Sequence, residues 1–301
     1  MNIPNEHIDM PLLTEKGIQL YIKREDTIHP FISGNKYRKL KYNLLEAKKQ
    51  GKNTLLTFGG AFSNHIAATA YAGKEQGLKT IGVIRGEELA FKWQDNPTLQ
   101  LAHRHGMEFY FVSRSDYRLK SEPAFLQQIR ERFGDVYLLP EGGTNALAVK
   151  GCTEILTDAD AKFDYICSAA GTGGTVAGLI NASLPHQTVL GFPALKGDFL
   201  IEEIRTFVQN KRWQLVTDYH FGGYAKVDQQ LVAFINLFKS KTGIPLDPIY
   251  TGKMLFGIFD LIKRDVFQPG TQILAIHTGG LQGIEGMNHI LKKKNLPLLD
   301  V

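Results

Sequence analysis

Lys36 stands in the stretch Ser33-Gly34-Asn35-Lys36-Tyr37-Arg38-Lys39-Leu40, which decides how the rest of the sequence is interpreted. The small residues before it predict a turn, and the pattern after it predicts that Lys36 lies in the first turn of a helix. A helix N-terminus carries partial positive charge, which disfavours a cation at that end. Lys36 is therefore expected to lose its proton easily, as a lysine that forms a Schiff base must.

Short apolar runs alternate with helical stretches along most of the chain. Because strands separated by helices form parallel βαβ units, the sequence predicts an α/β fold whose parallel sheets are covered by helices on both faces. In such sheets, ligands bind beyond the carboxyl ends of the strands. The runs interpreted as strands are 54–58, 80–84, 109–112, 136–139, 165–168, 189–192 and 273–276.

A glycine-rich segment, Gly171-Thr172-Gly173-Gly174-Thr175, follows one of these strands and opens an apolar stretch. Backbone N–H groups of successive glycines can converge on an anion, and a helix N-terminus adds its dipole. A tight strand-to-helix turn is the alternative reading. The two hydroxyls among the glycines favour a phosphate site. The segment matches neither the dinucleotide-binding nor the ATP-binding glycine motif, which argues against both ligands.

Three further segments occupy similar junctions: 63–65 (Ser-Asn-His), 250–253 (Tyr-Thr-Gly-Lys) and 278–280 (Thr-Gly-Gly). Each can be explained by helix capping or by a simple turn, since Ser, Thr and Asn satisfy free backbone N–H groups. The functional alternative places the same side chains in a cleft that faces a ligand.

The composition narrows the function classes. Of the 301 residues, 43% are hydrophobic and 22% are charged, which is typical of a globular enzyme of one large domain or two ordinary ones. The net charge of +5 is scattered without an aromatic-interleaved basic stripe, so we expect no nucleic-acid partner. The isolated Cys152 and Cys167 predict no metal site and a reducing, cytoplasmic location. No apolar run predicts a membrane span, and the polar N-terminus does not resemble a signal peptide.

The order of the motifs is more specific than any one of them. It runs KRED…SGNKYRKL, TFGGAFSNH, PEGGTN, GTGGT, YTGK and HTGG. This order resembles the fold-type-II pyridoxal-phosphate enzymes of the tryptophan synthase β superfamily. Within it, the chain is similar to the 1-aminocyclopropane-1-carboxylate (ACC) deaminase/D-cysteine desulfhydrase family, from about Pro11 to Gly283. The resemblance implies two domains of three layers each, αβα, with twisted, mostly parallel sheets.

By this resemblance, residues 1–44 and 156–301 would form a large cofactor-binding domain, residues 45–155 a small domain, and the cleft between them the active site. Family members are commonly homodimers. The resemblance implies that Lys36 carries pyridoxal phosphate on its amine and moves protons at the substrate α-carbon. Asn64 would bind the 3′ oxygen of the cofactor, and Tyr250 would stack near its pyridine ring. The phosphate would be held by Gly171, Thr172, Gly173, Gly174 and Thr175.

The substrate side of the site follows from the same resemblance. The carboxylate of a small amino acid would lie against Ser63, Asn64 and His65, with Thr278 and Gly279 also at the substrate. Tyr224 would face the cofactor across the site and, like Ser63 and Tyr250, would take part in catalysis. The loop around Tyr224 and the presence of Phe62 before Ser63 depart from the usual family pattern.

Two positions divide the family. ACC deaminases have Glu at the position of Thr251 and Leu at that of Thr278. A carboxylate beside the pyridine nitrogen keeps it protonated and makes a deep electron sink, whereas a neutral threonine makes a weaker one. The sequence therefore favours β-elimination of D-cysteine to pyruvate, ammonia and sulfide. The alternatives are ACC deamination, another superfamily reaction such as β-replacement or racemisation, and a cofactor-binding homologue with little turnover.

Overall fold

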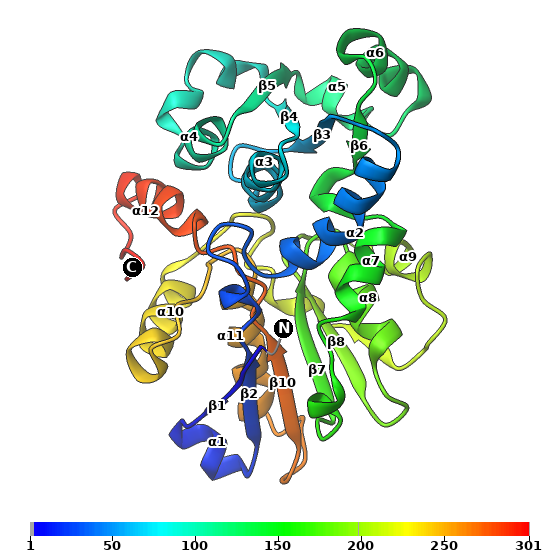
Figure 1. The fold of residues 1–301 in the computed structure, drawn as a ribbon. Coiled ribbons are helices and arrows are strands. Elements are labelled where there is room, and N and C mark those ends of the chain that lie inside the picture. Colours follow the sequence, from blue (N-terminus) through cyan, green and yellow to red (C-terminus); the bar gives the residue numbers. More distant parts are fainter. Residues whose placement is uncertain (1–2, 198, 301) are drawn as a thin grey trace.

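The computed structural model describes residues 3–197 and 199–300, and its strands form two sheets (Figure 1). The larger sheet has the strand order β1-β2-β10-β7-β8-β9, and the smaller has the order β5-β4-β3-β6. Neighbouring strands are parallel throughout, except that β1 runs antiparallel to β2. The strands are β1 Asn5–Ile8, β2 Gln19–Lys23, β3 Thr54–Gly59, β4 Lys79–Arg85, β5 Met107–Val112, β6 Tyr137–Leu139, β7 Tyr165–Ala170, β8 Thr188–Pro193, β9 Trp213–Leu215 and β10 Gln272–Ile276.

Helices cover both faces of each sheet. Buried residues of α2, α3 and α4 pack on one face of the smaller sheet, and those of α5 and α6 on the other. On the larger sheet, α7, α8 and α9 cover one face, and α1, α10, α11 and α12 the other. The α-helices are α1 Pro11–Lys16, α2 Asn35–Lys49, α3 Asn64–Gln76, α4 Pro97–Arg104, α5 Arg114–Arg118, α6 Pro123–Phe133, α7 Ala146–Thr153, α8 Gly174–Ala182, α9 Phe199–Arg205, α10 Gln229–Thr242, α11 Thr251–Lys263 and α12 Gly283–Lys293.

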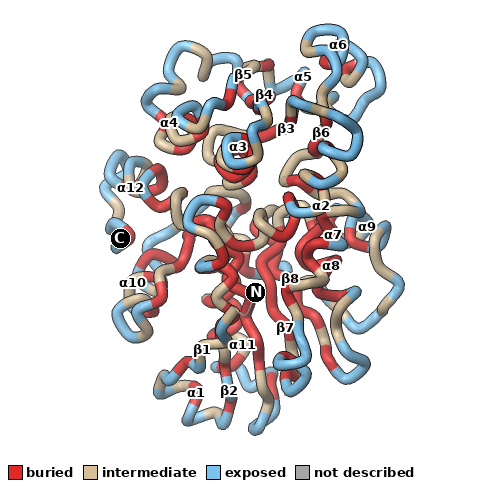
Figure 2. Tube along the Cα trace, in the orientation of Figure 1, coloured by how far each residue is buried: buried red, intermediate tan, exposed pale blue. Residues whose placement is uncertain are grey.

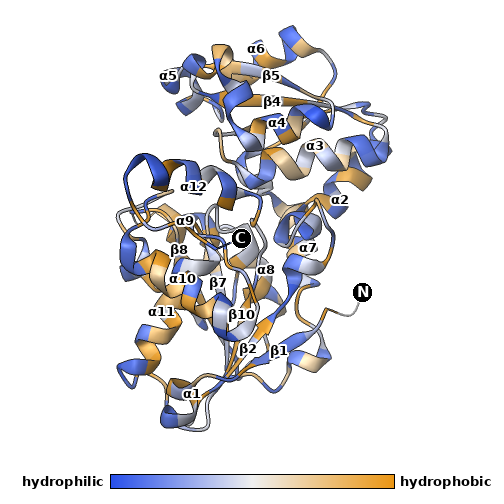
Figure 3. Cartoon of the chain, turned by 90° about the vertical axis from the view of Figure 1, so that its left-hand side faces the viewer, coloured by the Kyte–Doolittle hydropathy of each residue, from blue (hydrophilic) through white to orange (hydrophobic). Residues whose placement is uncertain are grey.

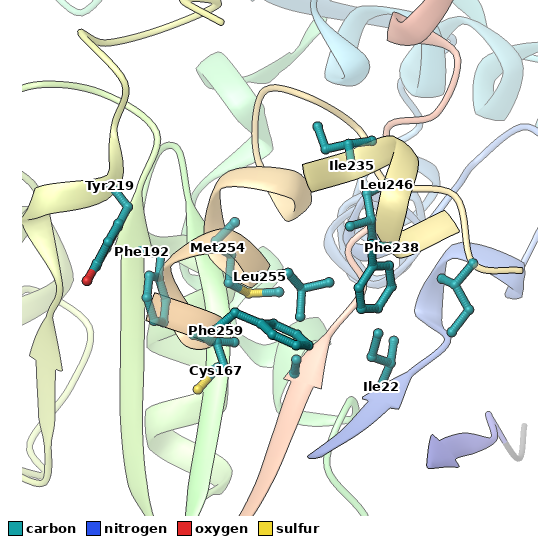
Figure 4. Close-up of a cluster of buried hydrophobic side chains, with 14 of the residues drawn as sticks. Ile22, Cys167, Phe192, Tyr219, Ile235, Phe238, Leu246, Met254, Leu255 and Phe259 are labelled. Atoms are coloured by element: carbon teal, nitrogen blue, oxygen red, sulfur yellow. The ribbon is translucent and has the colours of Figure 1, made fainter. Parts of the chain in front are cut away.

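The central strands β3, β4, β7, β8 and β10 consist largely of consecutive buried residues, and Figure 2 shows buried segments in the interior of each lobe. In β3, Leu55 packs toward α2 and α3, whereas Leu56 and Phe58 pack toward α5 and α6. This double burial explains why the strands appear in the sequence as continuous apolar runs rather than as alternating ones. Figure 4 shows the largest core, in which Phe238 and Phe259 from α10 and α11 lie over Ile22 and Cys167 of the sheet.

The fold class predicted from the sequence is confirmed: the chain has two three-layer αβα units with nearly all-parallel sheets. In Figure 3 the two lobes lie one above the other, with hydrophobic strands inside and hydrophilic residues on many outer helix faces. The strands of the smaller sheet all lie within 54–139. The helices α2 and α7, which contain or adjoin the predicted domain boundaries near 45 and 155, pack against each other where the chain passes between the two sheets. Because this contact joins the two lobes, these boundaries stay predictions. Within residues 3–197 and 199–300, no helix combines the length and apolar character needed to cross a membrane.

Candidate active site

A cavity of about 290 Å³ opens where strands of both sheets end. Residues that follow β3 and β6 of the smaller sheet, with Arg85 at the end of β4, line one side, and residues that follow β7, β8 and β10 of the larger sheet line the other. The carboxyl ends of parallel strands are where α/β sheets bind ligands. The first turn of α2, with Lys36, also lines the cavity.

Lys36 is held in place by a close backbone contact. Gly34 precedes α2 with φ at 61°, and a Cβ there would lie 2.0 Å from the carbonyl oxygen of Thr278. Only glycine allows both the left-handed conformation and this approach. The turn therefore fixes the start of α2 against the end of β10. Lys36 Nζ donates a hydrogen bond to Asn35 Oδ1 at 2.9 Å.

The electrostatic surroundings favour the neutral form of this amine. Burial lowers the pKa of Lys36 to about 7, and the positive charge of Lys39 acts in the same direction. Lys36 is thus uncharged in a substantial fraction of molecules at neutral pH. A neutral amine is what attack on a carbonyl carbon and proton removal both require.

Lys39 was not singled out from the sequence, yet it is the second cation of the cavity. It lies one turn after Lys36, is only 3% exposed, and forms no salt bridge within the described part of the chain. Its Nζ donates to the Gly142 carbonyl oxygen at 3.0 Å and to Thr144 Oγ1 at 2.9 Å. Its spacing of three residues from Lys36 was the signal that could have identified it, because such residues share a helix face.

The glycine-rich segment lies beside Lys39 and begins α8. Gly173 has φ at 79°, and a Cβ on Gly174 would lie 3.3 Å from Lys39 Nζ. Asn35 Nδ2 donates to Thr175 Oγ1 at 2.8 Å, which links the starts of α2 and α8. The free N–H groups at the start of α8, the hydroxyls and the unpaired ammonium together form a pocket suited to a phosphate dianion.

The segment 63–65 begins α3. Ser63 caps the helix by accepting a hydrogen bond from the Ile66 N–H at 3.3 Å, and Asn64 Oδ1 accepts one from Gln282 Nε2 at 2.6 Å. His65 is buried, with Nε2 2.8 Å from Thr57 Oγ1 and no partner for Nδ1 within the residues described. Burial lowers the pKa of His65 well below its usual value, and the charges of Lys36 and Lys39 add to this effect. His65 is therefore a neutral imidazole.

Two tyrosines come together on another wall. The rings of Tyr224 and Tyr250 are 6.3 Å apart in an edge-to-face arrangement. Burial raises the pKa of both phenols, and that of Tyr250 lies well above its usual value. Both hydroxyls therefore stay protonated at neutral pH and can act as donors. The loop that carries Tyr224 is pinned by Lys253, whose Nζ donates to the carbonyl oxygens of His220 and Gly223, each at 2.9 Å.

Thr251 and Thr278, which the sequence analysis treats as a pair, have different surroundings. Thr278 lines the cavity. Thr251 is fully buried and is not among the cavity residues; its hydroxyl donates to Asp247 Oδ2 at 2.7 Å. Asp247 also accepts the N–H groups of Ile249, Tyr250 and Thr251, so its carboxylate caps α11 rather than facing the cavity.

Most of the predicted site residues meet at this one cavity. Gly174, Thr251 and Gly279 are the predicted residues that do not line it. Besides Lys39, the lining residues that the sequence analysis missed are Asn35, Gly60, Arg85, Glu141, Gly142, Ala169, Ala170, Val176, Leu195 and Phe199. The predicted residues that do line the cavity are Lys36, Ser63, Asn64, His65, Gly171, Thr172, Gly173, Thr175, Tyr224, Tyr250 and Thr278.

Residues 4–279 match the family model described as pyridoxal-phosphate dependent enzyme, and the chain belongs to this family. A solved structure described as an ACC deaminase homologue has a TM-score of 0.84 and 30% identity, covering 97% of this chain and 94% of its own. A Pyrococcus horikoshii protein, provisionally named 1-aminocyclopropane-1-carboxylate deaminase, is 33% identical over 89% of this chain and 86% of its length. An Arabidopsis thaliana protein named bifunctional D-cysteine desulfhydrase/1-aminocyclopropane-1-carboxylate deaminase is 30% identical over 89% of this chain and 74% of its length.

The residues present fit pyridoxal phosphate. A buried, unpaired ammonium on Lys39 lies beside a glycine-rich helix start, as a phosphate requires. A lysine with a lowered pKa lies in the same cavity, as covalent attachment through an amine requires. The chain is therefore a pyridoxal-phosphate dependent enzyme in which Lys36 and the 171–175 segment are the candidate attachment and phosphate sites.

Proposed function

We propose that the chain is a lyase that converts D-cysteine to pyruvate, ammonia and sulfide. The observation that carries the proposal is that position 251 is a threonine and contributes no carboxylate, while Thr278 presents a residue with a hydroxyl at the cavity wall. Glu141 is the acidic residue that lines the cavity in the described part of the chain, and Tyr117 and Lys120 engage its carboxylate. A neutral partner for the pyridine nitrogen suits removal of an α-proton and loss of thiolate better than opening of a cyclopropane ring.

Each step has a candidate residue in this chain. Pyridoxal phosphate, when bound, withdraws electrons from the substrate α-carbon. Ser63 and Asn64 would bind the substrate carboxylate from the start of α3, where the helix dipole favours an anion. Lys36 would take the α-proton on Nζ. Tyr224 or Tyr250, whose phenols stay protonated, would donate a proton toward the departing sulfur.

The experiment is keto-acid release from purified, cofactor-loaded protein offered D-cysteine, L-cysteine, D-serine and ACC in parallel. The proposal predicts pyruvate and sulfide from D-cysteine and no 2-oxobutyrate from ACC. Release of 2-oxobutyrate from ACC with no reaction of D-cysteine would overturn it. That result would also mean that ring opening does not require a carboxylate at position 251.

Two broader predictions from the sequence accompany this proposal. The resemblance to commonly dimeric enzymes supports a homodimer, and the two buried free thiols Cys152 and Cys167 support a reducing, cytoplasmic location. Both stay predictions. Sedimentation of the holoprotein at micromolar concentration measures the first directly.

A further inference from the structure

Arg85 is a charged cavity residue for which the proposed chemistry has no role. It is the last residue of β4, whose neighbour β3 leads into the turn before Ser63. One guanidinium nitrogen, Nη2, lies 3.5 Å from the position that a Cβ on Gly60 would occupy. Arg85 therefore lies against the loop that precedes the expected carboxylate site, within the same cavity as Lys36.

The charge of Arg85 has no acidic partner within the described residues. The acidic groups nearby are already engaged: Glu88 pairs with Arg114 at 2.9 Å, and Glu141 pairs with Lys120 at 3.3 Å. An arginine stays protonated at all relevant pH values, so this charge is permanent. A permanent cation at a cavity without a protein counter-ion attracts an anionic ligand.

Aromatic packing supports the guanidinium. Its central carbon lies 5.7 Å from the centroid of the Tyr117 ring, a cation–π distance. The Tyr117 hydroxyl donates to Glu141 Oε1 at 2.8 Å, which fixes the ring between α5 and the residues after β6. Arg85 is otherwise exposed, so its planar fork of five N–H donors is accessible to a ligand and suits bidentate binding of a carboxylate.

The other cations of the cavity have proposed roles. Lys36 would attach the cofactor, and Lys39 would bind its phosphate. The substrate α-carboxylate would be bound by the start of α3, which leaves Arg85 without a ligand group. We propose that Arg85 is a specificity-determining residue that binds a second carboxylate, carried by the substrate side chain beyond Cβ. This inference rests on the proposed function. The site and the β-elimination are the same, and the substrate differs from D-cysteine only in its side chain.

The test uses two ligands that differ in one charge, S-methyl-D-cysteine and S-carboxymethyl-D-cysteine. Their dissociation constants are measured by calorimetry on the holoprotein and on the variants Arg85→Met and Arg85→Lys. Arg114→Met is the matched control, since Arg114 is an exposed arginine of the same domain that pairs with Glu88 and does not line the cavity.

We expect the unaltered protein to bind the carboxymethyl ligand about tenfold or more tightly than the methyl ligand, as one charge-assisted bidentate contact provides. Arg85→Met should abolish this preference and leave binding of the methyl ligand within about twofold, whereas Arg85→Lys should keep part of it. Arg114→Met should behave as the unaltered protein.

Two results would overturn the inference. Equal binding of the two ligands by the unaltered protein would show that the cavity does not recognise the second charge. Equal weakening of both ligands in Arg85→Met would show that Arg85 binds the α-carboxylate instead. Pyruvate release from D-cysteine by the same preparations tests the proposed function separately, since either result can be obtained without the other.

Discussion

Two groups of buried or half-buried cations lie within one short stretch of this chain, and their surroundings are opposite. Lys23 pairs with Asp160 at 2.7 Å, and Arg38 makes two hydrogen bonds of 2.9 Å to Glu25. Lys36 and Lys39, on the same helix as Arg38, form no salt bridge within the described part of the chain. The paired cations connect elements of the fold, whereas the unpaired cations face the cavity and are expected to find their counter-charge in a ligand.

This difference follows from the cost of burying a charge. A buried ion without a partner lowers stability unless its pKa shifts or a ligand compensates it. The pKa values of Lys36 and Lys39 are both lowered by burial, as expected for amines in this setting. Removing a paired cation's partner should therefore damage the fold, and removing an unpaired cation should damage the function.

The largest expected effect is that of Lys36→Ala. Turnover of D-cysteine should fall by about 10³-fold or more, because the group that attaches the cofactor and moves the α-proton is lost. The visible absorbance band of the bound cofactor should disappear, while the far-UV circular dichroism stays unchanged. Turnover equal to that of the unaltered protein would break the distinction between the two groups of cations.

Glu25→Gln should have the largest effect on stability. It leaves the buried Arg38 without its bidentate partner, at a cost of about 3–5 kcal/mol in the free energy of unfolding. Urea unfolding of the cofactor-free protein measures this quantity. Asp265→Asn is the matched control, because its pair with Lys16 is exposed on the carboxylate side and should be worth about 0–1 kcal/mol. Equal losses in the two variants would contradict the prediction.

Lys39→Met should lower the affinity for the cofactor and have little effect on stability, the reverse of what is expected for Glu25→Gln. Affinity for pyridoxal phosphate should fall by about tenfold or more, because a charged donor to the phosphate is lost. Stability of the cofactor-free protein should fall by no more than about 1 kcal/mol, since an uncompensated buried charge is also removed. Equilibrium dialysis and urea unfolding provide the two values. Lys41→Met is the control, as Lys41 pairs with Glu154 at the surface.

The smallest effect concerns pH. The lowered pKa of Lys36, about 7, means that its amine is uncharged above that pH. The rate at which the cofactor-free protein captures pyridoxal phosphate should rise with pH and level off above about 7. In Lys39→Met the midpoint should move to higher pH, because the Lys39 charge contributes to lowering the Lys36 pKa. A midpoint at the ordinary lysine value of 10.5 would contradict the predicted environment.

Much of the fold could be predicted, because parallel strands buried on both faces are apolar runs. The run predicted at 80–84, for instance, is β4 at Lys79–Arg85. The missed strands are β1, β2 and β9. Asn5–Ile8 and Trp213–Leu215 are short strands at the edges of the sheet, where half-buried polar residues obscure the pattern. Gln19–Lys23 ends in a lysine whose burial depends on the distant Asp160, which local sequence cannot show.

The site was predictable where a local pattern reflects the chemistry. Gly34 before Lys36 and Gly173 after Thr172 both have a positive φ. The small residues around each glycine in the sequence already indicate a turn there. Arg85 and Glu141 were missed because a charged residue at or just after a strand end is usually a surface residue. Both reach the cavity through the order of the strands in the sheet, which local sequence does not show. Thr251 was assigned to the cofactor from the family resemblance; its hydroxyl donates to Asp247 in the structure, and the assignment stays a prediction.

The most direct test of the distinction between paired and unpaired cations is to locate the covalent attachment of the cofactor. The holoprotein is reduced with borohydride and digested, and the modified peptide is identified by mass spectrometry. We predict a pyridoxyl label on Lys36 and no label on Lys23, Lys39 or Lys253. A label on one of these other lysines, with Lys36 unmodified, would contradict the assignment of Lys36 as the attachment site.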